Sequence, residues 1–284
     1  MILVTGATGH TGQRLVRRLL ERGDAVRVLT RNPAKLPEGI GGRVELAQAS
    51  LDDPAASGAA TTGCSVVIAM THIRFAPQVI AAAKAGEARR VIFMSSTRRF
   101  TQFPEETARA VILGEDQVRQ SGLDWTIIRP SMIYGGPEDN NIEHLVRALR
   151  RWPVHPMVGG GRMRWQPVFT WDVVQALVAA LDRPETIGHD YTVAGPEAIS
   201  YREMVKTILD GTNRRVLLLP IPMAAARLAA RMLGMVSTRP RITLDQIRRL
   251  EEDKVFDISP ARRELGFDPV SFKEGIRRKL AGEA

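Results

Sequence analysis

The feature that most constrains this chain is a glycine series that follows its first apolar run. Residues 2–4 read Ile-Leu-Val, glycines stand at positions 6, 9 and 12, and an amphipathic segment begins directly after them. The spacing predicts a strand, a tight turn and a helix, because glycine has no Cβ to obstruct the turn or a close helix–strand contact. The alternative is a strand–turn–helix with a structural role only.

A helix N-terminus in this context presents free N–H groups to phosphate, so the turn predicts a dinucleotide-binding loop. The residues expected to contact the cofactor there are Gly6, Thr8, Gly9, His10, Thr11 and Gly12.

Short, β-branched, apolar segments alternate with helical patterns through the first half of the chain. The expected strands span 2–5, 25–30, 43–48, 65–70, 90–95 and 125–130. They are apolar on both faces, as strands buried inside a parallel sheet are. This alternation predicts an α/β fold with a doubly wound parallel sheet of the Rossmann type.

The pattern changes in the second half of the chain. An irregular insert is expected over 135–165, followed by a helix near 170–182 and a short strand at 191–194 that return to the sheet. From 196 onward the pattern is mostly helical, with one strand at 216–220. We therefore expect a nucleotide-binding core over 1–195 and a smaller substrate or partner lobe over 196–284, packed as one unit with the core.

The end of the second strand indicates which dinucleotide binds. An NAD site places Asp or Glu about 20 residues beyond the glycine loop, where the carboxylate accepts from the ribose hydroxyls. Here the strand ends in Thr30-Arg31-Asn32, without an acid. Because a guanidinium pairs well with a 2′-phosphate, Arg31 and Asn32 favour NADP(H) over NAD(H). The alternative is that Arg31 is an ordinary surface residue of a β–α loop.

Composition excludes several classes of function. The net charge of +9 suggests a nucleic-acid partner, but the basic residues are scattered over helical faces without a long basic tail, so we expect no nucleic acid. The single cysteine, Cys64, is expected to be buried and indicates a reducing compartment, hence the cytoplasm. No apolar run reaches the roughly 20 residues of a membrane span, and no signal peptide or metal site is expected. The expected assembly is a monomer or a homodimer.

Several motifs resemble the short-chain dehydrogenase/reductase superfamily, in its extended and atypical branches, and most of all its NmrA-like NAD(P)-binding group. They are VTGATGHTG at the N-terminus, MSS at 94–96, SGLDWTIIRPSMIYG, QPVFTWDVVQAL and YTVAGPEAISYREMV. The resemblance implies cofactor contacts at Ser50, Leu51, Ala69, Met70, Thr71, Ser95 and Pro130. It places a serine, Ser50, where the family often has an aspartate near the adenine, while Asp52 and Asp53 are expected to cap the next helix.

The resemblance also implies a catalytic serine and a Tyr-x-x-x-Lys pair, of which only the serine, Ser96, is present. Aligning Glu115 with the family's glutamate puts Thr107 and Val111 at the tyrosine and lysine positions, and no lysine occurs between Lys84 and Lys206. The remaining candidates for acid–base chemistry are His72, after the fourth strand, and Tyr134, which is expected to line the pocket or to pack in the core.

Two functions stay open on this basis. The first is an NADPH-dependent reductase of a quinone-like or carbonyl acceptor. The second is a non-catalytic NADP(H) sensor or regulatory module that binds a protein partner. A structural-subunit role is a third possibility.

Overall fold

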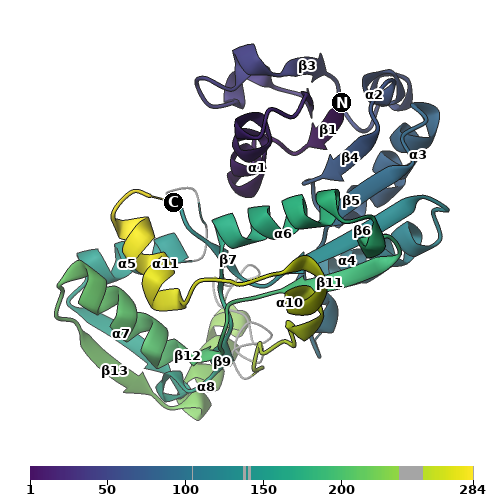
Figure 1. Cartoon of the computed structure of the whole chain (residues 1–284). Helices are drawn as coiled ribbons and strands as arrows, with labels where there is room; N and C mark the ends of the chain where they lie inside the picture. Colours follow the sequence, from purple (N-terminus) through teal and green to yellow (C-terminus); the bar gives the residue numbers. More distant parts are fainter. Residues whose placement is uncertain (104, 137–138, 140–141, 237–251, 284) are drawn as a thin grey trace.

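The chain folds around one parallel sheet (Figure 1). Successive strands are added first toward one edge of the sheet and then toward the other. The structure is a computed structural model, and it describes residues 1–103, 105–136, 139, 142–236 and 252–283. The seven-stranded sheet has the order β11-β6-β5-β4-β1-β2-β3, and every pairing is parallel. Its strands are β1 (Ile2–Thr5), β2 (Val26–Thr30), β3 (Glu45–Gln48), β4 (Val66–Ala69), β5 (Arg90–Met94), β6 (Asp124–Pro130) and β11 (His189–Val193).

This order confirms the doubly wound fold. The chain moves from β1 to β3 on one side of the sheet and from β4 to β11 on the other, so the strand order reverses between β1 and β4. In such sheets a crevice opens at the carboxyl ends of the strands where the order reverses, and ligands bind there. One expectation was wrong: β3 is an edge strand that is mostly exposed, with Leu46 at 44% exposure, rather than a buried strand.

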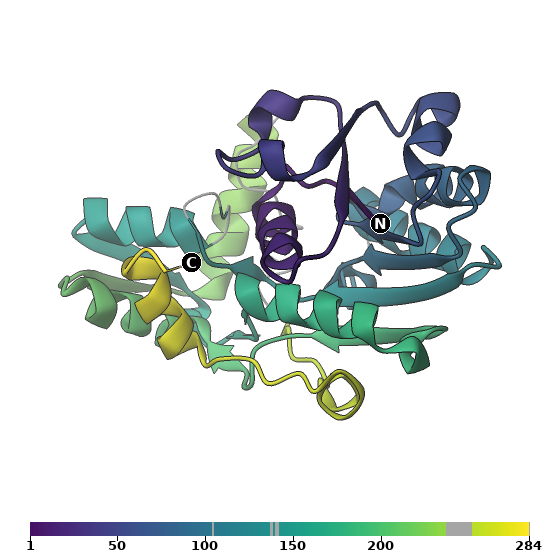
Figure 2. The same cartoon turned by 45° about the horizontal axis from the view of Figure 1, so that its top comes forward.

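Helices cover both faces of the sheet. On one face α1 lies beside α6; on the other α2 packs on α3, and α3 on α4 (Figures 1 and 2). The periodicity of α1 explains its place, since Leu15, Val16 and Leu19 share the face buried against the sheet. The bounds are α1 (His10–Glu21), α2 (Pro54–Thr61), α3 (Ala76–Ala85), α4 (Glu106–Arg119) and α6 (Thr170–Asp182).

A second lobe lies beyond the carboxyl end of the sheet (Figure 1). Its helices and longer strands are α5 (Ile142–Arg151), β8 (Val154–Val158), α7 (Tyr201–Thr212), β13 (Leu217–Ile221), α8 (Met223–Val236) and α11 (Phe272–Leu280). Short strands complete it: β7 (Ile133–Tyr134), β9 (Arg164–Trp165), β10 (Val168–Phe169) and β12 (Ile199–Ser200). These elements surround their own apolar cluster, which includes Met157, Met204 and Ile276.

The lobe differs in two ways from the sequence expectation. The stretch expected to be an irregular insert, 135–165, supplies α5 and β8, and β8 pairs in parallel with β13 from the C-terminal part. Conversely, α10 (Ser259–Leu265) packs on β11 and α6 of the core, although it follows residue 196. Both placements depend on contacts between segments that are far apart in the sequence. The local sequence pattern does not contain these contacts.

Lys279 joins the last helix to the loop that follows β7. Its buried ammonium donates to the carbonyl oxygens of Gly135 and Gly136, at 2.6 Å each, and forms ion pairs with Asp139 at 3.3 Å and Glu143 at 2.9 Å. A buried ammonium needs this many acceptors to offset its lost hydration. The contact therefore fixes α11 to the start of α5.

Candidate functional site

The glycine loop lies at the point where the strand order reverses, and its geometry explains two of its glycines. Gly6 has φ +68°, and a Cβ there would lie 2.8 Å from the backbone of Met70 and Thr71 at the end of β4. A Cβ on Gly12 would lie 2.3 Å from the Gly6 carbonyl oxygen. Both distances are far below a normal carbon contact, so these positions require glycine for the loop to pass between β4 and α1.

Gly9 has a different role, because it stands at the N-cap of α1 without a side-chain cap. Its missing Cβ would lie 3.3 Å from the Gly6 oxygen, which is tight but not prohibitive. The first N–H groups of a helix have no acceptor within the helix, and they carry the positive end of its dipole. Gly9 and Thr8 line a cavity, so this end of α1 lies at the cavity wall.

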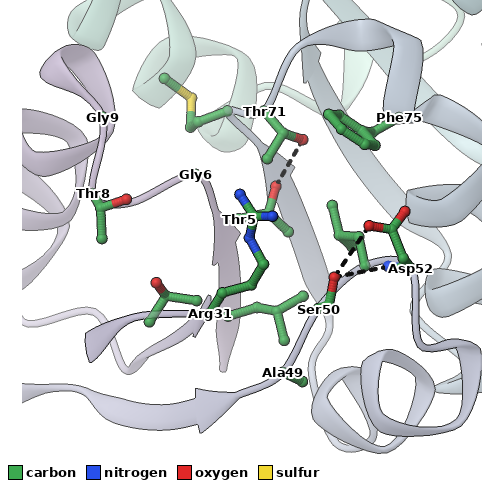
Figure 3. Close-up of a pocket in the computed structure, with 14 residues that line it drawn as sticks. Thr5, Gly6, Thr8, Gly9, Arg31, Ala49, Ser50, Asp52, Thr71 and Phe75 are labelled. Atoms are coloured by element: carbon green, nitrogen blue, oxygen red, sulfur yellow. Dashed lines mark hydrogen bonds between the residues drawn. The ribbon is translucent and has the colours of Figure 1, made fainter. Parts of the chain in front are cut away.

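The cavity measures about 300 Å³ and opens at the carboxyl ends of four neighbouring strands (Figure 3). Each strand end and the segment after it contributes part of the wall. The lining residues are Thr5, Gly6, Thr8, Gly9, Leu29, Thr30, Arg31, Ala49, Ser50, Leu51, Asp52, Met70, Thr71 and Phe75. Thr5 and Thr71 face each other across β1 and β4, with 3.4 Å between their hydroxyl oxygens (Figure 3).

At the end of β2, Arg31 and Asn32 diverge. Arg31 is exposed, lines the cavity, and within the described part of the chain its guanidinium makes no hydrogen bond or ion pair. The Asn32 side chain instead caps a single turn at Pro33–Lys35, accepting from the Ala34 N–H at 3.1 Å, and does not line the cavity. An arginine without an acidic partner at this place is available to a ligand anion.

At the end of β3, Ser50 and Asp52 form a polar pair on the cavity wall (Figure 3). The Ser50 hydroxyl donates to an Asp52 carboxylate oxygen at 3.3 Å and accepts from the Asp52 N–H at 3.2 Å. Asp52 was expected to cap the next helix, but Asp53 alone does so, accepting from the Ala56 N–H at 3.0 Å. The cavity wall thus includes the carboxylate of Asp52, for which the sequence predicted a capping role instead.

The predicted cofactor residues divide into two groups. Those that line the cavity are Gly6, Thr8, Gly9, Arg31, Ser50, Leu51, Met70 and Thr71. Those that do not line it are His10, Thr11, Gly12, Asn32, Ala69, Ser95 and Pro130. The sequence reading missed Thr5, Leu29, Thr30, Ala49, Asp52 and Phe75. Most of these residues end a predicted strand or follow it directly, and this position at the carboxyl edge of the sheet could have predicted them. Phe75 has no such position.

The three candidates for acid–base chemistry lie outside this cavity. The Ser96 hydroxyl accepts from the Arg98 N–H at 3.2 Å, and His72 Nδ1 accepts from the Arg74 N–H at 3.1 Å. Partial burial, together with nearby Arg74 and Arg98, lowers the pKa of His72, so its ring is neutral at pH 7. Each side chain therefore stabilises a turn at a strand end.

Tyr134 does not line this cavity, and of the two alternatives for it the structure shows packing in the core. It is fully buried in the lobe core between Phe169 and Phe272, with ring centroids 5.6 and 5.1 Å away. Burial raises the pKa of its phenol, and among the described residues its hydroxyl has no hydrogen-bond partner. The side chain packs as a core residue.

On α4, the positions aligned with the tyrosine and lysine hold a half-buried Thr107 and a fully buried Val111. One turn further on, Glu115 is the centre of a buried ionic cluster. Arg129 donates to both its carboxylate oxygens at 2.7 Å, and the hydroxyl of Ser95 donates at 2.6 Å.

Three further side chains extend this cluster, and one of them, Arg99, lies 3.4 Å from Glu115. Arg119 lies 3.1 Å from Glu115 and 2.8 Å from Asp190, and Asp190 also pairs with Arg129. Burial by itself raises the pKa of Asp190, but hydrogen bonds from Arg129 and Arg119 outweigh it and hold that pKa below its usual value. With its acceptors satisfied in this way, the cluster is a structural element rather than a source of protons.

The profile of a family described as NAD(P)H-binding matches residues 6–184, from the glycine loop to the end of α6. The chain belongs to this NAD(P)H-binding family. The match also confirms the resemblance to atypical short-chain dehydrogenases/reductases.

Three relatives span most of the chain. An NAD(P)H azoreductase from Xenophilus azovorans is 27% identical, over 83% of this chain and 82% of the relative. A (4-alkanoyl-5-oxo-2,5-dihydrofuran-3-yl)methyl phosphate reductase from Streptomyces griseus is 32% identical, over 81% and 80%. Subunit 9 of the NADH dehydrogenase [ubiquinone] 1 alpha subcomplex from Arabidopsis thaliana is 28% identical, over 88% and 69%.

A solved structure with this fold is the NADPH-dependent quinone oxidoreductase QOR2 from Escherichia coli. It superposes with a TM-score of 0.73, at 20% identity, over 99% of this chain and all of that one. This likeness shows the shared fold.

Proposed function

We propose that this protein is an NADPH-dependent reductase whose acceptor takes a hydride without help from an enzyme acid. The observation that carries the cofactor assignment is Arg31, an arginine without an acidic partner on the cavity wall at the end of β2. NADPH, when bound, supplies the hydride. The cavity, the glycine loop and the helix N-terminus fit such a dinucleotide.

The residues that would hold the cofactor follow from their chemistry. The backbone of Gly6 and Gly9 and the first turn of α1 would hold the pyrophosphate, because no Cβ obstructs it there and the helix dipole favours an anion. Arg31 would pair with the 2′-phosphate. Ser50 and Asp52 would accept hydrogen bonds from the adenine amino group.

The acceptor class follows from α4. Val111 has no charge with which to lower the pKa of a neighbouring acid, and a threonine hydroxyl at 107 is a weak acid at neutral pH. Quinone-like acceptors, which include azo dyes in their quinone-hydrazone form, suit this chemistry best, because hydride transfer to them leaves a weakly basic phenolate-type anion that can take up its proton from water. Two of the relatives, the azoreductase and the dihydrofuranyl-methyl phosphate reductase, support a reductase role.

The test is steady-state oxidation of NADPH against a panel of quinones, azo dyes, aldehydes and ketones. We expect turnover of quinones or azo dyes, and none of simple ketones. Brisk ketone reduction would contradict the proposal, because it requires an acid that the described residues do not offer.

A second function, a non-catalytic NADP(H) sensor or a partner-binding subunit, is favoured by the same α4 residues. A sensor needs the nucleotide cavity but no acid–base pair, and one relative is a subunit of a larger complex. Tight NADPH binding without oxidation against any acceptor of the panel would select it.

The compartment and assembly are part of the proposal. With Cys64 as its single cysteine the sequence has no disulfide framework, and on this basis we propose a reducing compartment, the cytoplasm. None of the helices in the described ranges is long and apolar enough to cross a membrane. We propose a monomer or a homodimer.

A further inference from the structure

The lobe carries an apolar face that the described residues leave uncovered. In the β8–β13 ribbon Leu217 pairs with Val154 and Leu219 with Pro156, so these side chains share one face. Leu217, Leu219 and Val154 are exposed to 64, 49 and 43%. Trp152, just before β8, is 58% exposed. We call these five residues the ribbon patch.

The other face of the ribbon packs on the core of the lobe. Leu218 and Met157 alternate with the patch residues and contribute to the lobe's apolar cluster. A strand that needs only one buried face normally places polar side chains on the other. Here the outer face is as apolar as the inner one, and contiguous exposed apolar patches mark interaction sites.

Arginines precede both strands of the ribbon. Two arginine pairs, Arg150-Arg151 and Arg214-Arg215, precede the two strands, and all four are exposed. A hydrogen bond of 2.9 Å from Arg214 to the Arg150 carbonyl brings the pairs together. The stretches 144–171 and 211–244, which contain both strands, include 11 arginines and not one aspartate or glutamate. Every other stretch of the sequence that lacks an acid contains at most four basic residues.

We propose that the ribbon patch docks this protein on the surface of an anionic lipid bilayer. Apolar side chains would enter the boundary between headgroups and acyl chains, and the arginines would meet the lipid phosphates. Trp152, with the Arg151 guanidinium 5.5 Å from its ring, has the amphipathic shape that favours this boundary.

Charge selects the bilayer over the other occupants. A second copy of this chain would bring the same four arginines of each copy together across a symmetric interface, where they repel. A nucleic acid would pair with the arginines but leave Leu217 and Leu219 in water. In Figure 1 β13 lies at the far end of the lobe from β1 and β4, so docking leaves the nucleotide cavity accessible.

The experiment is flotation of the full chain with vesicles of phosphatidylcholine alone or with one quarter phosphatidylglycerol. We expect binding to the anionic vesicles only, weakening as salt is raised from about 0.1 to 0.5 M. Each arginine near such a surface contributes about fivefold in affinity, so Arg151→Gln/Arg215→Gln should weaken binding by at least about tenfold. Leu217→Gln/Leu219→Gln should weaken it at least as much.

A control variant makes one change of each kind elsewhere. Leu113→Gln/Arg89→Gln alters an exposed leucine and an exposed arginine of the nucleotide-binding half, and should bind vesicles as the unmodified protein does. An equal thermal shift with NADPH in all variants confirms that each is folded. The fluorescence of Trp152 should move to shorter wavelength on anionic vesicles, a change that Trp152→Phe removes.

Three results would overturn the proposal. They are absence of binding to anionic vesicles, binding that the control weakens as much as the patch variants, and binding that survives Leu217→Gln/Leu219→Gln. A dimer that this double variant dissociates, without vesicle binding, would assign the patch to a second copy instead.

Discussion

The two sides of the strand reversal have kept very different chemistry. Around β1 and β2 the glycine loop, the start of α1 and Arg31 retain what a dinucleotide requires. Around β5 and α4, Thr107 and Val111 stand at the positions that we align with the family's tyrosine and lysine, and Glu115 belongs to a buried ionic cluster. One side is built to hold a ligand, the other to hold the protein together.

The difference teaches that cofactor binding and proton delivery are separable demands on this fold. The glycine loop is constrained by backbone geometry, since a single Cβ at Gly6 or Gly12 collides with neighbouring backbone. The α4 side chains are constrained by packing and ion pairing, and an acid–base pair is required there only by a reaction that uses one. When the reaction does not need an acid, α4 can serve stability alone.

The largest effect should come from breaking the structural side. Glu115→Ala leaves Arg129 buried without its bidentate partner, and removing one member of a buried ion pair costs about 3–5 kcal/mol. Urea unfolding should show this loss. The neighbouring Asp116→Ala, whose side chain is 48% exposed, should cost less than about 1 kcal/mol. Equal losses would mean that the cluster is not the stabilising element.

On the binding side, Gly9→Val should abolish the thermal shift with NADPH while leaving the unliganded fold largely intact. The valine side chain would occupy the space beside the Gly6 oxygen at the cavity wall. Gly41→Ala, at a glycine with open space around it, is the control and should bind normally. A thermal shift that survives in the Gly9 variant would move the phosphate site elsewhere.

Arg31→Ala should weaken NADPH binding by about 1.5–3 kcal/mol and leave NADH binding nearly unchanged, because only NADPH carries the 2′-phosphate. Titration calorimetry with both nucleotides measures this directly. If the unmodified protein binds the two equally, and the variant does too, the assignment of NADP(H) is wrong.

Asp172 is a buried carboxylate that, unlike Glu115, has no arginine among its described hydrogen-bond or ion-pair partners, although the charge of Arg278 acts to lower its pKa. Burial raises its pKa to about 6, although the Val270 N–H donates to it. Since an unfolded aspartate titrates near 3.9, the folded state binds the proton more tightly, and this stabilisation is complete below about pH 4 and lost as the pH rises through 6. Asp172→Asn should therefore gain about 1–3 kcal/mol relative to the unmodified protein between pH 4 and pH 7. A difference in unfolding free energy that stays constant with pH would contradict the assignment.

Ser96→Ala should have the smallest effect, less than about threefold on kcat/KM for a quinone or azo acceptor. The hydroxyl of Ser96 stabilises a turn, and the proposed acceptors take their proton from water. Loss of most activity in this variant would show that Ser96 donates to the substrate, and His72 would be the next residue to change.

The sequence predicted the parts of the molecule that local pattern determines. The sheet strands, α1, α6 and the loop at Gly6 follow from apolar periodicity and glycine spacing, and eight of the predicted cofactor residues line the cavity. Asp52 was misassigned because the sequence does not show which of two adjacent carboxylates turns back to cap the helix.

The lobe was less predictable, because it is held by pairings between distant segments. β8 and β13 are about 60 residues apart, and neither has a partner in its own neighbourhood. The cluster at Glu115 also draws on β5, β6 and β11, so a glutamate in a helical pattern gave no sign of its partners.

The contact of Lys279 determines the order in which the sheet and the lobe can fold during translation. The nucleotide-binding sheet is complete once β11 has been translated, whereas the loop after β7 lacks its ammonium until residue 279 has followed. Between these two points the nascent chain carries a finished sheet beside an unfinished lobe. A chaperone or protease that acts during translation would meet this protein at the lobe.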